Sequence, residues 1–328
     1  MQTDLPTRAF GQTGLDITRV GFGAWAIGGN MWGPQDDADS IAAVRHAVER
    51  GINWVDTAAV YGNGHSEDVI AKALEPLGPD ERPLVFTKGG IVRDADGGNP
   101  RRLAADIRRQ CEDSLRRLRV ERIDLYQLHW PSDDVPLERS WGEMQRLKED
   151  GLVAHVGLSN HWGDQLEEAE AIGHVETLQP PFSAIKRAAA ETVLPWCAGH
   201  GTGVICYSPM QAGLLTGTFT RARVASLAEN DHRRANPAFQ GDALTANLAL
   251  ADALKPVAEK HGVGQGAVAI AWCLAWPGLT GAIVGARSPE QVEGWIAAAS
   301  LELDAEDMAT IAAAIEITGA GEGLTRSS

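Results

Sequence analysis

The chain has 328 residues, of which 44% are hydrophobic, so it is long enough for one large globular domain or two small ones. Its 44 acidic residues outnumber 29 basic ones and give a net charge of −15. Binding to nucleic acid or to an anionic membrane depends on clustered Lys and Arg, so we expect neither as a partner.

Cysteine and apolar patterns exclude further classes. The four cysteines are scattered, without a CxxC pair or a His at ligand spacing, so we expect neither a disulfide nor a metal site. No run reaches the roughly 18 apolar residues of a membrane span, and the opening residues MQTDLPTRAF contain no apolar signal core. We therefore expect a cytoplasmic protein.

Turn and periodicity signals give the elements in chain order. Residues 8–20 have a Gly-centred turn between polar and branched residues, which predicts an N-terminal β-hairpin. Residues 39–50 repeat apolar side chains at helical spacing and stop at Gly51, a typical helix end. The same alternation recurs, with strands predicted within 20–29, 53–58, 84–90, 124–130, 154–160, 177–183, 204–210 and 280–286, and helices at 66–74, 101–118, 137–150, 165–172, 191–199 and 289–299, plus two between strands seven and eight.

Eight strand–helix cycles follow one another. Helices between successive strands impose parallel pairing, and eight units favour a closed (β/α)8 TIM barrel over a doubly wound sheet. We predict one domain over residues 1–328. The irregular stretch 216–246 is interpreted as a lid-like loop after the seventh strand, and the tail 319–328 is expected to be mobile.

Ionisable side chains stand at three successive predicted strand ends. Asp56 ends the second strand and Tyr61 follows it, while Lys88 and His129 end the third and fourth. Three of them have a simpler interpretation alone: a helix cap or turn former for Asp56, a solvated charge for Lys88 and a core imidazole for His129. The active site of such a barrel lies at the carboxyl ends of its strands, so the four side chains are expected to converge.

Convergence of these groups suggests chemistry on a carbonyl. A phenol has a pKa of about 10, and we expect a desolvated Lys88 ammonium, fixed by Asp56, to lower the pKa of Tyr61. His129 can donate a hydrogen bond to a carbonyl oxygen near Tyr61. The site would then polarise a carbonyl and protonate its oxygen. None of the four side chains is a hydride donor, so a cofactor must supply the reducing equivalents.

Polar residues at the remaining strand ends suit a nicotinamide dinucleotide. Ser159, Asn160 and Gln179 can hold a carboxamide edge, and Tyr207 can stack on a flat ring. Arg287, before the last predicted helix, can meet a phosphate. An alternative role for Ser159 and Asn160 is to cap the following helix, and an alternative for Arg287 is a surface ion pair. The glycines within 20–29 do not form the GxGxxG fingerprint of a Rossmann fold.

In these residues and in the motifs around them the chain resembles the aldo-keto reductases, including their branch similar to bacterial aryl-alcohol dehydrogenases and potassium-channel β subunits. The motifs GFGAW, DTAAVYGNGHSE, FTKGG, LYQLHW, VGLSN, LQPPFS, YSPMQAGLLTG and IVGARSPEQV carry the resemblance from about residue 8 to residue 300. It implies a catalytic tetrad of Asp56, Tyr61, Lys88 and His129. It also implies NADPH bound in extended form, with these residues around it: Trp25, Asp56, Ser159, Asn160, Gln179, Tyr207, Ser208, Pro209, Met210, Gly213, Gly285, Arg287 and Gln291.

Three positions depart from the family pattern. Thr218 stands where many members have Lys, and Gly294 and Trp295 replace a Glu-Asn pair. Those positions touch the pyrophosphate and adenine in relatives, so NADH is a possible cofactor besides NADPH.

The first hypothesis is an NADPH-dependent reductase of aldehydes or ketones, or the reverse oxidation, with Tyr61 as general acid. An alternative is a cofactor-holding regulatory subunit of the channel β-subunit type with little turnover. A third is a Schiff-base lyase with Lys88 as nucleophile. Met31, Trp32 and Trp130 are expected to form an apolar mouth suited to aromatic or alicyclic carbonyls.

Overall fold

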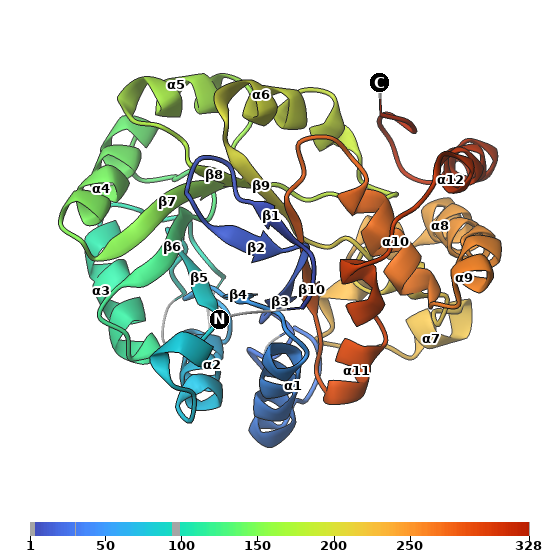
Figure 1. The fold of residues 1–328 in the computed structure, drawn as a ribbon, viewed down its shortest axis with the longest axis horizontal. Helices are drawn as coiled ribbons and strands as arrows, with labels where there is room; N and C mark the ends of the chain where they lie inside the picture. Colours follow the sequence, from blue (N-terminus) through green and yellow to red (C-terminus); the bar gives the residue numbers. More distant parts are fainter. Residues whose placement is uncertain (1–3, 30, 94–98, 328) are drawn as a thin grey trace.

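A computed structural model describes residues 4–29, 31–93 and 99–327. Eight parallel strands close into a barrel in the order β10-β3-β4-β5-β6-β7-β8-β9, with helices around it (Figure 1). This confirms the predicted (β/α)8 class. The barrel strands are β3 (Val20–Gly23), β4 (Trp54–Asp56), β5 (Leu84–Gly89), β6 (Ile123–Leu128), β7 (Val153–Ser159), β8 (Thr177–Gln179), β9 (Gly203–Cys206) and β10 (Gly281–Gly285).

Most of the outer helices have a buried face. In α1 (Asp37–Glu49) the side chain of Asp36 caps the first turn by accepting from Ala38 N at 2.7 Å, and Val44 and Val48 are buried. The others are α2 (His65–Leu74), α3 (Ile107–Leu118), α4 (Leu137–Glu149), α5 (Asp164–Ile172), α6 (Val193–His200), α7 (Arg221–Ala225), α8 (Gly241–Ala253), α9 (Lys255–His261), α10 (Gln265–Leu274), α11 (Pro289–Glu293) and α12 (Ala305–Thr318).

Several predicted boundaries were wrong. Helix α3 begins at Ile107 rather than residue 101, because Arg101 instead pairs with Val92 in a short antiparallel bridge. The predicted helix 289–299 breaks at Gly294 into α11 and a 3-10 turn, Ile296–Ala299. The stretch 216–246 is not wholly irregular, since it contains α7, two further 3-10 turns and the start of α8.

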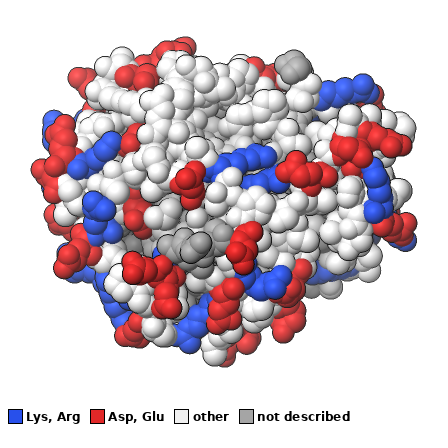
Figure 2. Space-filling view, in the orientation of Figure 1, with Lys and Arg blue, Asp and Glu red and all other residues white. Residues whose placement is uncertain are grey.

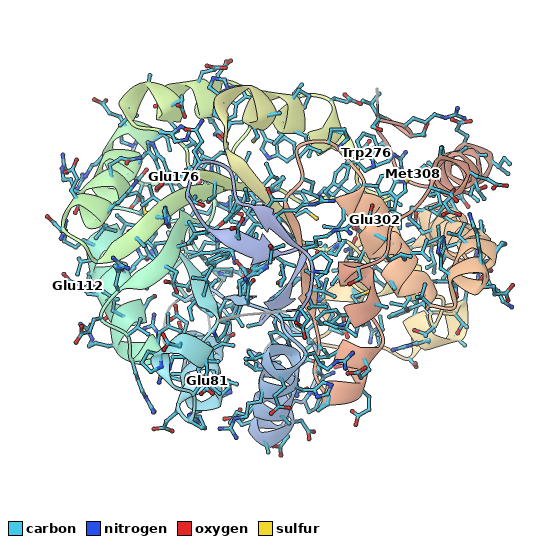
Figure 3. All side chains as sticks on the ribbon, in the orientation of Figure 1. Glu81, Glu112, Glu176, Trp276, Glu302 and Met308 are labelled. Carbon is cyan, nitrogen blue, oxygen red and sulfur yellow. The ribbon has the colours of Figure 1, made fainter. Side chains whose placement is uncertain are left out.

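The chain end is more ordered than its composition suggested. Helix α12 was not predicted. Its Met308, labelled in Figure 3, packs against the main core, which is the larger cluster of buried apolar side chains and includes residues of both strands and helices. The tail after it was expected to be mobile, yet Arg187 donates from Nη1 to Ala320 O at 3.0 Å and from its backbone N to Glu322 O at 3.3 Å. The glycine-rich start of the tail is therefore held against the body of the protein.

The predicted N-terminal hairpin is present and closes the amino-terminal end of the barrel. Strands β1 (Thr7–Ala9) and β2 (Asp16–Thr18) pair antiparallel and lie across the front of the barrel in Figure 1. Phe10 and Ile17 are fully buried in one apolar cluster with Trp54 and Phe86 from β4 and β5. The indole of Trp54 also donates to Thr18 O at 2.8 Å. The hairpin thus seals the end of the barrel opposite to the strand ends that carry the ionisable residues.

Gly21 of β3 gives a test of this packing. An added Cβ would lie 2.2 Å from Cε2 of Trp54, so we expect Gly21→Ala to destabilise the fold by about 1–3 kcal/mol. Gly142 in α4 is the matched control: nothing lies within 4 Å of its added Cβ, and Gly142→Ala should stabilise by about 0.5–1 kcal/mol. Urea unfolding measures both. Equal midpoints for Gly21→Ala and the wild type would contradict the packing described.

Inward positions change character along each strand. Trp54, Phe86 and Leu125 belong to the apolar cluster above the hairpin. Two residues later on the same strands stand Asp56, Lys88 and Gln127, because alternate residues of a strand point to the same side. The barrel therefore places polar side chains directly above an apolar floor.

The hairpin face of the molecule carries charges of both signs. Figure 2 shows Lys and Arg side chains interspersed with Asp and Glu on the hairpin face rather than gathered into one basic patch. Within the described parts of the chain, no helix combines the length and apolarity needed to cross a membrane.

Candidate active site

A buried ion pair lies at the centre of the candidate site. Lys88 Nζ donates to Asp56 Oδ1 and also to Thr57 O at 2.8 Å, and the two charged side chains are 0% and 3% exposed. Asp56 is the last residue of β4, and Lys88 lies near the end of the neighbouring β5. Burial lowers the pKa of Lys88, while the Asp56 carboxylate opposes that shift.

Tyr61 and His129 lie beside this pair. Lys88 Nζ is 5.3 Å from the centroid of the Tyr61 ring, and the rings of Tyr61 and His129 are 5.8 Å apart and almost perpendicular. The turn after β4 brings Tyr61 back through a bond from its backbone N to Ala58 O at 3.0 Å. The four side chains expected to converge are thus neighbours at the carboxyl-terminal mouth.

The protonation of Tyr61 differs from the expectation. Burial raises the pKa of Tyr61 well above its usual 10, and the negative charge of Asp56 adds to the shift. The prediction that Lys88 lowers this pKa was therefore wrong for the site that the protein alone forms, since desolvation of the phenolate dominates. Burial, followed by the charge of Lys88, holds the pKa of His129 well below 6.5. The site presents a protonated phenol and a neutral imidazole at neutral pH.

Gln179 connects the ion pair to the next strands. Its Nε2 donates to Asp56 Oδ2 at 2.9 Å and to Gln127 Oε1 at 3.1 Å. Gln127 Nε2 is 3.4 Å from the same carboxylate oxygen. Sequence reasoning missed Gln127, because a single polar residue in a strand has no distinguishing spacing.

Ser159, Asn160 and Tyr207 continue the network around the mouth. Ser159 Oγ donates to Gln179 O at 2.9 Å, and Asn160 Nδ2 donates to Ser159 Oγ and to His129 O, both at 3.0 Å. Tyr207 OH donates to Asn160 Oδ1 at 2.8 Å. Helix α5 begins at Asp164 and no side chain caps it, so Ser159 and Asn160 are not its caps. Both residues serve the mouth of the barrel instead.

Backbone strain is concentrated at the same end. Seven described residues other than glycine have positive φ, and all except Arg119 lie on loops that follow barrel strands: Met31, Asn63, Asn160, Ser208, Gln211 and Ala212. Such conformations cost free energy and persist mainly where the surrounding structure holds them for function. The run from Ser208 to Gly213 (φ 96°) includes the predicted cofactor contacts Pro209, which is buried, and Met210, which packs against the main core.

Arg287 does not stand free at the mouth. Its guanidinium donates to the carbonyl oxygens of Trp32, at 3.2 Å, and Pro34, and to the side chain of Gln35. Its backbone N donates to Gln291 Oε1 at 2.9 Å. Arg287, which follows the exposed Gly285 of β10, thus holds the loop after β3, and among the described residues its guanidinium donates to neutral oxygens rather than to a carboxylate.

The positions that depart from the family pattern have structural partners here. Thr218 Oγ1 accepts from Arg223 Nη1 at 2.9 Å, so a guanidinium stands beside this threonine. Gly294 ends α11, and Trp295 is buried in the main core. Trp295 therefore packs inward instead of facing the mouth.

Aromatic rings cover the tetrad on one side. Trp25 lies 6.2 Å from the Tyr61 ring, 5.1 Å from Trp32 and 4.7 Å from His232. His232 comes from the long segment after β9 and joins it to the loop after β3, because its backbone N and its Nδ1 each lie 3.1 Å from Met31 O. Sequence reasoning missed His232, although its charged neighbours within a long loop were a usable signal.

Charged and polar side chains lie against two tryptophan rings of the predicted mouth. The guanidinium of Arg233 lies 5.0 Å from the Trp32 ring, and His232 lies 4.4 Å from it. The guanidinium of Arg102 lies 4.5 Å from the Trp130 ring. The Trp32 and Trp130 rings thus each carry a cation–π contact, although Arg233 is itself paired with Asp231, to which its Nε donates at 2.8 Å.

A (β/α)8 barrel with an ion pair, a phenol and an imidazole at its mouth is the class of site that the sequence predicted for a barrel oxidoreductase. The model of the Aldo/keto reductase family matches residues 19–316, and the chain belongs to this family of oxidoreductases.

Two curated relatives match nearly the whole chain. The aldo-keto reductase YhdN of Bacillus subtilis is 34% identical over 307 residues, covering 93% of this chain and 92% of its own. The NADH-specific methylglyoxal reductase of Escherichia coli is 33% identical, covering 93% of this chain and 98% of its own. Among solved structures, the glycerol dehydrogenase AKR11B4 of Gluconobacter oxydans aligns with a TM-score of 0.87 at 34% identity, covering 98% of each chain.

Proposed function

We propose that this protein is a nicotinamide-dependent oxidoreductase that reduces an aldehyde or ketone to an alcohol, or catalyses the reverse oxidation. The observation that carries the proposal is the position of the Tyr61 phenol beside the buried Lys88–Asp56 pair and the His129 ring. Membership of the Aldo/keto reductase family supports the reaction class.

Each of the four residues has a role in this reaction. When bound, the cofactor supplies a hydride from C4 of its nicotinamide to the carbonyl carbon. Tyr61 gives its proton to the carbonyl oxygen, and its high pKa keeps that proton available at neutral pH. His129, which is neutral, donates a hydrogen bond that orients the carbonyl. Lys88 and Asp56 provide a fixed dipole against the phenol.

The mouth fits a nicotinamide carboxamide. Gln179 Oε1 accepts no hydrogen bond from the described residues, and Asn160 Oδ1 accepts only that of Tyr207, so both keep capacity for an amide N–H. The proposed contacts are Trp25, Asp56, Ser159, Asn160, Gln179, Tyr207, Ser208, Pro209, Met210, Gly213, Gly285, Arg287 and Gln291. NADPH is the first cofactor to test, and NADH the second, because the Escherichia coli relative is NADH-specific.

We further propose that the substrate is small and bears polar groups. Two relatives are named for three-carbon compounds, methylglyoxal and glycerol. His232 beside Trp32 and Arg102 beside Trp130 are the proposed polar groups of the pocket that Met31, Trp32 and Trp130 are proposed to form.

The test measures oxidation of NADPH and of NADH by the purified protein with carbonyls of two classes. Methylglyoxal, glyceraldehyde and dihydroxyacetone form the first class, and benzaldehyde and cyclohexanone the second. A higher kcat/KM for the first class supports the proposed substrate. A higher kcat/KM for the second class would instead favour the apolar pocket for aromatic or alicyclic carbonyls that the sequence predicts. Tight cofactor binding without turnover of any carbonyl or alcohol would favour the regulatory subunit instead.

The pH dependence of reduction follows from the shifted pKa values of Tyr61 and His129. A general acid works in its protonated form, and the pKa of Tyr61 lies well above 10, so its proton is retained through pH 9. The pKa of His129 lies well below 6.5, so this ring stays neutral down to pH 6. We expect kcat for reduction to change by less than about threefold between pH 6 and 9. A steep fall of kcat centred near pH 7 would contradict this assignment.

A further inference from the structure

Gln127 is a fully buried amide that the proposed reaction does not yet use. It lies on β6, where the register pairs it with Lys88 of β5 on one side and Gly157 of β7 on the other. It stands two residues after Leu125 of the apolar floor and two before His129. Gln127 thus occupies the polar level of the barrel, below the mouth.

The hydrogen bonds of Gln127 fix the orientation of two amides. Its Oε1 accepts from Gln179 Nε2 at 3.1 Å, and its Nε2 faces Asp56 Oδ2 at 3.4 Å. Gln179 Nε2 donates to the same Asp56 oxygen at 2.9 Å. Rotating the Gln127 amide by half a turn would place its oxygen against the Asp56 carboxylate and its NH2 against that of Gln179. Both contacts would then be repulsive.

Two consequences follow for the groups that the network holds. The side-chain amides of Gln179 and Gln127 donate to Asp56 Oδ2. This leaves Asp56 Oδ1 to accept from Lys88 Nζ. The NH2 group of Gln179 donates to Asp56 and to Gln127. Among the described residues its Oε1 therefore remains free to accept a hydrogen bond from a ligand. One buried side chain therefore sets both the ion pair beside Tyr61 and the proposed carboxamide acceptor.

We propose that Gln127 is a positioning residue that couples the cofactor-binding amide of Gln179 to the Lys88–Asp56 pair. This inference rests on the proposed function, because it assigns Gln127 to the same reaction. It differs from simple core filling, since a side chain of similar volume without the amide would fill the space and leave Gln179 and Asp56 with only the hydrogen bond between them.

Two substitutions separate these possibilities. Gln127→Leu keeps most of the volume and removes the hydrogen bonds, so we expect kcat to fall about tenfold as the ion pair loses its fixed geometry. The Kd for NADPH, measured by quenching of tryptophan fluorescence, should rise about threefold or more, because the Gln179 amide loses one of the two hydrogen bonds that orient it. Thr177→Val is the matched control: Thr177 is fully buried on β8, its hydroxyl has no partner among the described residues, and the substitution should leave kcat and Kd unchanged.

Gln127→Glu gives a readout that a packing role cannot produce. The introduced carboxylic acid, when protonated, can donate to Asp56 and accept from Gln179, as the amide does. When ionised, it places a second negative charge beside Asp56. We therefore expect kcat relative to the wild type to be close to one at pH 5.5 and to fall at least tenfold by pH 9, whereas the ratio for Gln127→Leu stays constant.

Each outcome bears on the proposal. Unchanged kcat and Kd in Gln127→Leu, or equal pH-independent losses in both Gln127 variants, would overturn it. If Gln127→Leu does not fold, the pH profile of Gln127→Glu decides alone. If the wild type turns over no carbonyl, the proposed function fails, and the change in NADPH Kd for Gln127→Leu then supports or rejects the orienting role by itself.

Discussion

Replacing Tyr61 by Phe is expected to lower kcat by roughly 10²–10⁴-fold, the usual contribution of a general acid. The substitution removes only the hydroxyl group, so the ring keeps its contacts with His129 and Trp25. We expect the NADPH Kd to stay within about twofold, since the network that holds the proposed carboxamide site does not include the phenol oxygen. Steady-state reduction of the best carbonyl at saturating cofactor measures the effect.

Tyr126→Phe is the matched control for this prediction. Tyr126 is also fully buried, but its side chain belongs to the apolar core that the strands share with the surrounding helices. Its hydroxyl has no hydrogen-bond partner among the described residues. Removing that hydroxyl should leave kcat unchanged. A Tyr61→Phe protein that reduces carbonyls at the wild-type rate would show that another group donates the proton.

The convergence of the tetrad could be predicted because it depends on topology. Each of Asp56, Lys88 and His129 ends an apolar run followed by helical periodicity, and eight such cycles close into one barrel. Once the runs are assigned as parallel strands, their carboxyl ends must share one mouth. Residues separated by more than 70 positions are therefore placed together without any knowledge of side-chain contacts.

What sequence reasoning missed depends on contacts between distant loops. The raised pKa of Tyr61 comes from burial beneath neighbouring side chains, which the spacing of DTAAVYG does not encode. Arg287 is predicted to meet a phosphate, but its hydrogen bonds to the loop after β3 could not be predicted from the sequence. Gln127 and His232 have no motif of their own, and only the closed barrel and the folded loop reveal their partners.

Helix lengths show the same limit on a smaller scale. The apolar periodicity over 289–299 continues through Gly294, yet the structure breaks there because Trp295 turns into the core. The tail 319–328 was predicted to be mobile, but the buried Arg187, more than 130 residues earlier, donates a hydrogen bond to Ala320 O and holds the start of the tail. Local composition can predict an element, but tertiary contacts decide where it ends.

The buried ion pair gives the largest expected effect on stability. Lys88→Met leaves the Asp56 carboxylate buried without its cation, and removing one partner of such a pair costs about 3–5 kcal/mol in the free energy of unfolding. The same protein should show no measurable carbonyl reduction. Urea unfolding at pH 7 measures the first effect and NADPH oxidation the second.

The double variant Asp56→Asn/Lys88→Met separates the structural from the catalytic role of the pair. It leaves no unpaired charge, and the new amide can still bond to Gln179, so we expect it to recover most of the stability lost in Lys88→Met. It has neither charge beside Tyr61, so activity should remain as low as in the single variant. Recovered activity would mean that the pair only supports the fold, whereas equal instability of the single and double variants would mean that the Lys88 stem, rather than its charge, is what the barrel needs.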